Sequence, residues 1–105
     1  MTFTLNRGGR DLAEALLAPL DDWAGRSPLV AQLHSGDVGW HLRLPDTAVA
    51  DAFWLWELDS VPVAAGLSED TMLRTAVSPD HDRSAELAEE MAASVAGFGY
   101  VDAPT

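Results

Sequence analysis

The hydrophobic and polar positions of this chain alternate at its start and then change to a helical spacing. Phe3 and Leu5 alternate with polar neighbours and are followed by Gly8-Gly9, which predicts a short first strand that ends at the glycines. Beyond the glycines, apolar residues recur every three or four positions, as on one face of a helix. These residues are Leu12, Leu16, Leu20 and Trp23.

The sequence also contains start and stop signals for helices. Asp11, followed three residues later by Glu14, has the form of a capping box and predicts the start of the first helix. We expect Pro19 to kink or shorten this helix, because proline cannot donate to the carbonyl four residues back. Residues 29–44 combine helical spacing with strand-like alternation. A short helix that ends before Pro45 is the favoured interpretation.

The central part of the chain predicts an antiparallel meander of three strands. The strands are Phe53–Leu58, Val61–Leu67 and Thr71–Val77. The first is so densely apolar and aromatic that it suits a strand covered on both faces. Asp59-Ser60 supplies a tight turn to the second strand, where Gly66 is the expected site of a bulge, and Glu69-Asp70 turns the chain into the third.

A last helix is expected to begin near Asp82 or Ser84 and to end at Gly97. Residues 98–101 are consistent with one more strand. The predicted fold is therefore a single α/β (α+β) domain over residues 1–105. Its expected order is strand, helix, helix, three-stranded antiparallel meander, C-terminal helix and a final strand.

Composition and charge narrow the function classes. The chain has 105 residues, is 48% hydrophobic and contains no cysteine, so we expect one packed core without disulfides, in a reducing cytoplasm. No stretch has the ~20 apolar residues of a membrane span. The net charge is −11, of which residues 51–105 carry −9. Such an acidic surface does not suit nucleic acid as a ligand. The charge either keeps the protein soluble or attracts a basic protein partner, and both possibilities stay open.

Four segments of the sequence, together with this order of elements, resemble those of a known protein family. They are Gly36–Arg43, Leu55-Trp56-Glu57, the hairpin with Val63-Ala64-Ala65-Gly66, and Leu73–Val77 running into Ser78-Pro79-Asp80-His81. With them, the chain resembles the N-terminal half of a GNAT acetyltransferase fold. It is similar to the N-terminal GNAT-like domain of bacterial proteins that carry two such domains in tandem.

The resemblance implies a cofactor loop at the turn between Pro79 and Leu87. In the family this turn has the pattern Arg/Gln-x-x-Gly-x-Gly/Ala, whose glycines and free amides hold the pyrophosphate of acetyl-CoA. Here the three positions fall on Asp82, Ala85 and Leu87, so none keeps the pattern. Four residues near this turn are the cofactor-binding candidates that the resemblance implies. They are Val77, Arg83, Ser84 and Ala85.

The charge of this turn also opposes a phosphate ligand. Asp80, Asp82 and Glu86 place carboxylates where a dianion would lie, and in the sequence only Arg83 opposes them. Equally, acids are favoured at a helix N-terminus for their interaction with the helix dipole. We therefore expect that the chain binds no cofactor. If it is an active enzyme, the expected cofactor is acetyl-CoA.

Candidate catalytic residues are few. A GNAT base is commonly a carboxylate near the central strands, for which Glu57 and Glu69 are candidates, although both also suit solvated strand ends. His34, Asp37 and His41 have a spacing that could gather metal ligands, but nothing else in the chain supports zinc, so no metal site is predicted.

Two tryptophans leave a choice between core and interface. Trp54 and Trp56 point to the same face of their strand, where they would either pack in the core or anchor a partner. The leading hypothesis is a GNAT-like domain without catalysis, acting as a structural or interaction module as a homodimer or beside a second GNAT domain. The alternatives are an N-acetyltransferase completed by a partner and an acidic inhibitor or immunity-type protein.

Overall fold

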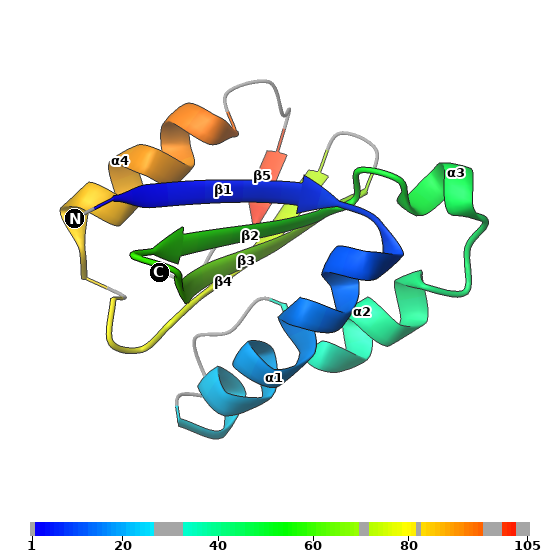
Figure 1. Cartoon of the computed structure of the whole chain (residues 1–105), viewed down its shortest axis with the longest axis horizontal. Helices are drawn as coiled ribbons and strands as arrows, with labels where there is room; N and C mark the ends of the chain where they lie inside the picture. The colour runs from blue at the N-terminus through cyan, green and yellow to red at the C-terminus, as the bar shows by residue number, and fades with distance from the viewer. Residues whose placement is uncertain (1, 27–32, 70–71, 82, 96–99, 103–105) are drawn as a thin grey trace.

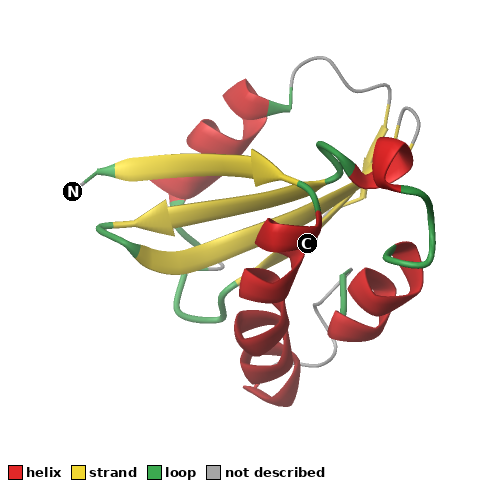
Figure 2. Ribbon diagram, turned by 45° about the vertical axis from the view of Figure 1, so that its right-hand side comes forward, coloured by secondary structure: helices red, strands yellow, loops and turns green. Residues whose placement is uncertain are grey.

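The computed structural model describes residues 2–26, 33–69, 72–81, 83–95 and 100–102. Within them the chain forms one five-stranded sheet with helices on both of its faces (Figures 1 and 2). The elements are β1 (Phe3–Gly8), α1 (Arg10–Arg26), α2 (Ser35–His41), α3 (Asp46–Val49), β2 (Phe53–Leu58), β3 (Val61–Glu69), β4 (Met72–Val77), α4 (Ala85–Ser94) and β5 (Tyr100–Asp102). The mixed α/β class predicted from the sequence is confirmed.

The strands lie in the order in which they occur along the chain. β1 to β4 are antiparallel neighbours, and β5 runs parallel to β4 and pairs with Met72–Arg74. The turn between β2 and β3 has positive φ angles at both of its residues, 49° at Asp59 and 71° at Ser60. Two such residues suit the right-handed twist of a two-residue hairpin, so the tight turn predicted at this point is confirmed.

Two hydrophobic clusters cover the two faces of the sheet. One lies under α1 and α2 and contains Leu16, Leu20 and Phe53 among its buried residues. The other lies under α4 and contains Trp54, Trp56 and Leu87. Figure 1 shows α4 on one side of the strands and α1 and α2 on the other. The strands are therefore the middle layer of three.

β2 is the most deeply buried strand. Phe53, Trp54, Leu55 and Trp56 have at most 4% of their surface exposed. Because successive side chains alternate between faces, Phe53 and Leu55 fill one cluster and the two indoles fill the other. The prediction of a strand covered on both faces is confirmed.

The predicted bulge at Gly66 is wrong. Gly66 lies in regular pairing between Trp54 and Thr75, and the register shift occurs where Trp56 faces Ala64 and Glu57 faces Pro62. Val63 is therefore the extra residue, and it turns to the same face as Ala64. Gly66 serves packing instead, since a Cβ there would lie 3.3 Å from both Trp54 Cβ and Trp56 Cζ3.

The first helix continues past Pro19 to Arg26, so the expected shortening does not occur. Leu16 and Leu20 on either side of the proline are 0% and 1% exposed. Burial of these flanking turns outweighs the lost backbone hydrogen bond, which costs about 3 kcal/mol in a helix interior.

The segment between α1 and β2 contains the predicted short helix and a second one that was not predicted. α2 ends before Pro45, as expected, and α3 begins directly after it. Arg10 holds the link between them: its guanidinium donates to the carbonyls of Leu42 (2.7 Å) and Leu44 (2.6 Å) and to Asp46 Oδ1 (2.5 Å). This fork ties the start of α1 to both short helices.

The last helix begins where predicted, after Ser84. Its expected end at Gly97 lies outside the described residues, and the final strand is present at Tyr100–Asp102. In the part of the chain that the structure describes, no helix has the length and apolar character needed to cross a membrane.

Gly66→Ala should lower the free energy of unfolding by about 1–2 kcal/mol, because the added methyl group would lie 3.2–3.3 Å from buried side-chain atoms of Leu73, Trp54 and Trp56. Gly39→Ala is the matched control. Gly39 lies in α2, where an added Cβ would meet no other part of the protein within 4 Å, so alanine should raise stability by about 0.5–1 kcal/mol. Urea denaturation measures both changes. A Gly66→Ala protein as stable as the wild type would contradict the close packing of the indoles.

Candidate functional site

The turn between β4 and α4 is the place where the resemblance puts a cofactor loop. It is built from two consecutive backbone turns, in which His81 N donates to Ser78 O (2.9 Å) and Ser84 N donates to His81 O (3.1 Å). Ser78 anchors the turn to the sheet, because it is only 4% exposed and its amide donates to Val63 O at 2.8 Å. The turn is therefore fixed to β3 at its first residue.

The N-terminus of α4 is capped by its own chain. Ser84 Oγ accepts a hydrogen bond from Leu87 N at 3.2 Å and satisfies one of the free amides of the first turn. Leu87 is 1% exposed and packs among Trp54 and Trp56. The position where the family has a small residue is thus used to dock α4 onto the sheet.

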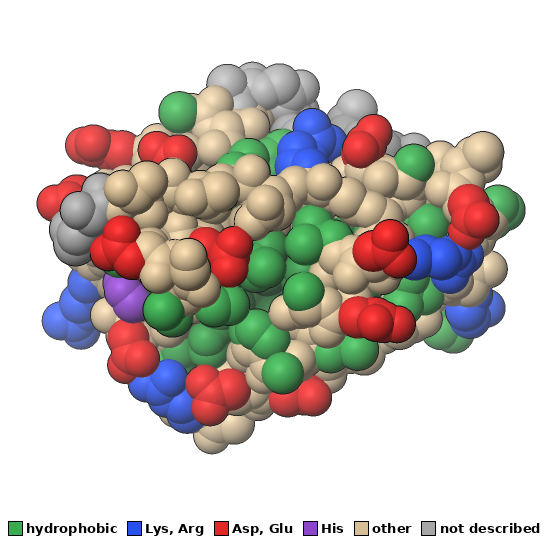
Figure 3. Space-filling view, in the orientation of Figure 1, with side chains coloured by type: hydrophobic (Ala, Val, Ile, Leu, Met, Phe, Trp, Pro, Cys, Tyr) green, Lys and Arg blue, Asp and Glu red, His purple; other side chains and the backbone are tan. Residues whose placement is uncertain are grey.

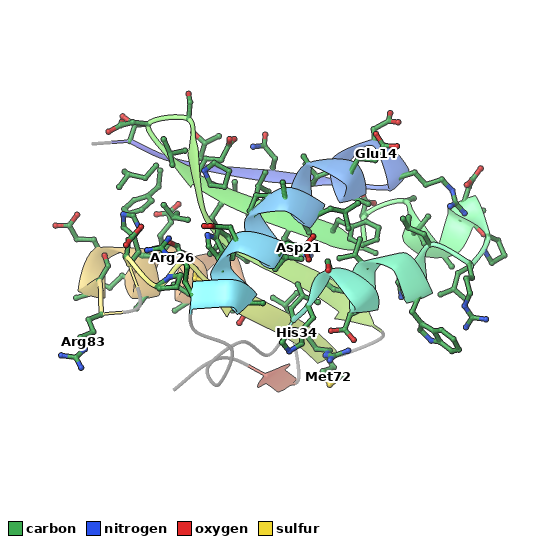
Figure 4. All side chains as sticks on the ribbon, turned by 90° about the horizontal axis from the view of Figure 1, so that it is seen from below. Glu14, Asp21, Arg26, His34, Met72 and Arg83 are labelled. Atoms are coloured by element: carbon green, nitrogen blue, oxygen red, sulfur yellow. The ribbon has the colours of Figure 1, made fainter. Side chains whose placement is uncertain are left out.

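The other cofactor-binding candidates do not converge on one point. Val77 is half-buried at the end of β4 and packs in the cluster under α4, whereas Arg83 and Ala85 are exposed. Figure 4 shows Arg83 extending away from the protein. Ser84 is held within the turn by its amide, which donates to His81 O, and by its hydroxyl, which caps α4.

An arginine that sequence analysis missed reaches the turn from the opposite helical layer. Arg26, at the end of α1, donates to Asp80 Oδ1 at 2.5 Å and more weakly to Asp22 Oδ2 at 3.4 Å. Figure 4 shows Arg26 beside this turn. The statement that only Arg83 opposes the acids is therefore wrong. Because Arg26 and Asp80 are 54 positions apart, no local pattern in the sequence signals the contact.

The ion pair shifts the pKa of both partners. The hydrogen bond from Arg26, aided by the positive charge of its guanidinium, holds the pKa of the Asp80 carboxyl below its ordinary value, although desolvation opposes this shift. The same hydrogen bond raises the pKa of Arg26. Both side chains are charged at neutral pH, and Asp80 is the partner of the arginine that reaches the turn from α1.

A surface pocket of about 250 Å³ lies beside this ion pair. It is lined by Pro19, Asp22, Trp23, Arg26, Val61, Pro62, Ser78, Asp80 and His81. The pocket thus has an apolar wall from α1 and β3 and a charged rim from the ion pair. Among the described residues, His81 Nδ1 is buried without a hydrogen-bond partner.

The two candidate catalytic carboxylates lie at opposite ends of the β2–β3 hairpin. Glu57 pairs with Pro62 near the turn, whereas Glu69 is the last residue of β3 and pairs with Met72. Glu57 Oε1 accepts a hydrogen bond from Asn6 Nδ2 at 2.8 Å, which gives this carboxylate a structural partner on β1. The two residues therefore do not form one site.

The residues weighed as metal ligands have separate structural roles. Asp37 Oδ2 accepts from His34 N at 2.9 Å, and Asp37 Oδ1 accepts from Arg74 of β4 at 3.3 Å. His41 is 8% exposed and meets the Phe53 ring edge-on, with centroids 5.8 Å apart. Within the described residues there is no group of three or more side chains that could hold a metal ion.

The two indoles proposed as an interface are 1% and 0% exposed. Trp54 and Trp56 lie 5.5 Å apart between ring centroids, and Trp56 Nε1 donates to Ser94 Oγ of α4 at 3.4 Å. Core packing, the alternative to an interface, is thus the role they have here. A partner would reach them only if α4 moved away.

A second pocket, of about 330 Å³, lies at the start of α1 beside α3. Its lining includes Gly9, Arg10 and Asp46. Since all three contacts of the Arg10 fork go to the α2–α3 segment, this arginine has a structural role at that pocket.

Comparisons of the chain with protein-family models, with curated proteins and with solved structures find no match.

The Arg26–Asp80 ion pair makes a testable contribution to stability. Because the pKa of Asp80 is lower in the folded protein, its contribution is fully present above the unfolded pKa of about 3.9 and is lost as the pH falls through the folded value. Asp80→Asn should therefore be less stable than the wild type at pH 7, and the difference should shrink below about pH 4. Urea denaturation between pH 3 and 7 measures this.

Asp22→Asn is the control for this experiment, since its contact with Arg26 is longer and its effect should be smaller. A difference between wild type and Asp80→Asn that stays constant over the whole pH range would show that the ion pair does not act as described.

Proposed function

We propose that this chain is a GNAT-like domain that does not bind acetyl-CoA and that serves as a structural or interaction module. The order of its elements supports this: a strand, helices, three antiparallel strands, a helix and a final strand follow one another as the resemblance implies.

The observation that carries the proposal is the Arg26–Asp80 contact at 2.5 Å. A pyrophosphate at the start of α4 would need positive charge and free amides. Here Arg26, which reaches the turn from α1, already holds a carboxylate of the same chain, and the exposed Arg83 extends away from the protein. An incoming dianion would have to displace Asp80, and both anions would then lie close together in the turn.

The packing of α4 supports the proposal in a second way. Ser84 already accepts a hydrogen bond from one amide of the first turn, and the exposed Glu86 adds a negative charge to that turn. Leu87 fills the position where the family has glycine or alanine and is buried against the sheet. Replacing it would loosen α4 from Trp54 and Trp56, so the space for a cofactor cannot be regained without cost to the core.

A thermal-shift titration with acetyl-CoA and with coenzyme A tests the proposal. A ligand at 100 times its dissociation constant stabilises a folded protein by about 2.7 kcal/mol, which is easily measured in a domain of 105 residues. We expect no shift at millimolar concentrations of either compound.

A saturable shift with acetyl-CoA would sink the proposal and favour an acetyltransferase. If a shift did occur, Asp80→Asn would locate the ligand: a cofactor phosphate at this turn should bind the variant more tightly, because the competing carboxylate is gone. An equal shift in both proteins would place the ligand elsewhere.

A further inference from the structure

β1 is one edge of the sheet, and it lacks the usual features that prevent an edge from pairing. Its register with β2 is continuous from Phe3 to Gly8. It contains no proline, and Arg7 is its only charged side chain. Natural edge strands are commonly protected by bulges, prolines or several charges. Among the described residues, no strand lies on the outer side of β1.

The register fixes which backbone groups of β1 point outward. Asp59 N donates to Thr2 O at 3.0 Å, so these two residues are a hydrogen-bonded pair across β1 and β2. Such pairs alternate along an antiparallel ladder, so Thr4, Asn6 and Gly8 also direct their backbone groups to β2. The amides and carbonyls that point away from the sheet therefore belong to Phe3, Leu5 and Arg7.

These three residues are self-complementary about a two-fold axis at Leu5. An antiparallel copy of β1 centred there pairs Leu5 with its equivalent and Phe3 with Arg7 of the second copy. All three outward residues then face outward residues, and each pair exchanges two hydrogen bonds. An axis between two residues would instead set outward groups against inward ones and form none.

We propose that two copies of this chain associate through antiparallel pairing of β1, with the two-fold axis at Leu5. The second copy would be the partner of the interaction module proposed above, so this inference rests on that proposed function. The pairing joins the two sheets into one. It places each Arg7, whose guanidinium lies 4.0 Å from the centre of the Trp54 ring of its own copy, opposite Phe3 of the second copy. Figures 1 and 3 look onto this edge, where hydrophobic side chains gather between β1 and α1.

Charge complementarity favours a second copy at this edge. The chain carries −11 overall, so two copies repel each other wherever acids face acids, but β1 contains no carboxylate. In the proposed register Arg7 of the second copy lies opposite Phe3, one residue from the Thr2–Asp59 pair. Its Cα is then roughly 10 Å from that of Asp59, two strand spacings away, which is about one Debye length. Because the dimer is symmetric, this attraction between Arg7 of one copy and Asp59 of the other occurs twice.

Molar mass measured by light scattering against concentration tests the association. The wild type should rise toward twice the monomer mass, and Arg7→Pro should stay monomeric, because proline removes an outward amide without touching the β1–β2 ladder. Arg7→Ala is the matched control, since it loses the same side chain but keeps the backbone. It should still dimerise, roughly tenfold more weakly.

Far-UV circular dichroism and tryptophan fluorescence show whether each variant is folded. An Arg7→Pro protein that is folded and still dimeric would overturn the β1 pairing.

Single cysteines test the register even if the proline variant does not fold, because the chain has no cysteine of its own. In the proposed dimer the two Leu5 Cα atoms are about 5.5 Å apart, within disulfide range. The two Thr2 Cα atoms are separated by six residues along the strands, roughly 20 Å. Leu5→Cys should therefore give a disulfide-linked dimer on oxidation and Thr2→Cys should not. Equal cross-linking of both variants would refute the register.

The outcomes separate this inference from the proposed function. A wild type that remains monomeric up to roughly 1 mM and does not bind coenzyme A would overturn the β1 pairing alone. The module would then need a different partner, such as a second GNAT domain or a basic protein. A chain that dimerises through β1 and also binds acetyl-CoA would overturn only the proposed function.

Discussion

Burial of β2 on both faces is the constraint on which the rest of the structure depends. Phe53 and Leu55 require a cover on one side, and Trp54 and Trp56 require one on the other. Helices must therefore pack on both faces, which α1, α2 and α4 do. Gly66 on the neighbouring strand suits this arrangement, because Leu73, Trp54 and Trp56 leave little space for a side chain there. The three layers follow from one strand and one glycine beside it.

The candidate site inherits its geometry from this packing. Docking of Leu87 against the indoles fixes where α4 begins, and so where the turn from β4 lies. Arg26 then reaches that turn from α1, in the other helical layer, and joins the two layers at one end of the sheet. The residues of the turn are thus accounted for by what they hold together: Ser78 fixes it to β3, Asp80 to α1 and Ser84 to α4.

Local features of this fold were predictable from the sequence, whereas contacts between distant segments were not. The apolar run of β2, the turn at Asp59-Ser60 and the start of α4 each have a signal within a few residues. The bulge at Val63 has none, because Val63, Ala64 and Ala65 fit either face of the strand equally well. The ion pairs of Arg10 and Arg26 join residues 36 and 54 positions apart, and only the folded chain brings them together. The charge balance of the candidate site likewise depends on one of these distant contacts, Arg26 with Asp80.

The arginines explain how so acidic a chain stays folded and where it can meet a partner. Arg10, Arg26 and Arg74 bind carboxylates of other elements, while Arg7 and Arg43 lie over the rings of Trp54 and Trp40. Five of the six arginines thus contact other side chains of the protein, and the exposed acids outnumber the remaining arginine, Arg83, on the outer surface. Any surface that approaches this chain must then either be basic or avoid those acids. α4, with exposed Glu86 and Glu89, suits only the first kind of surface, whereas β1 is a strand on which a second acidic molecule meets no carboxylate.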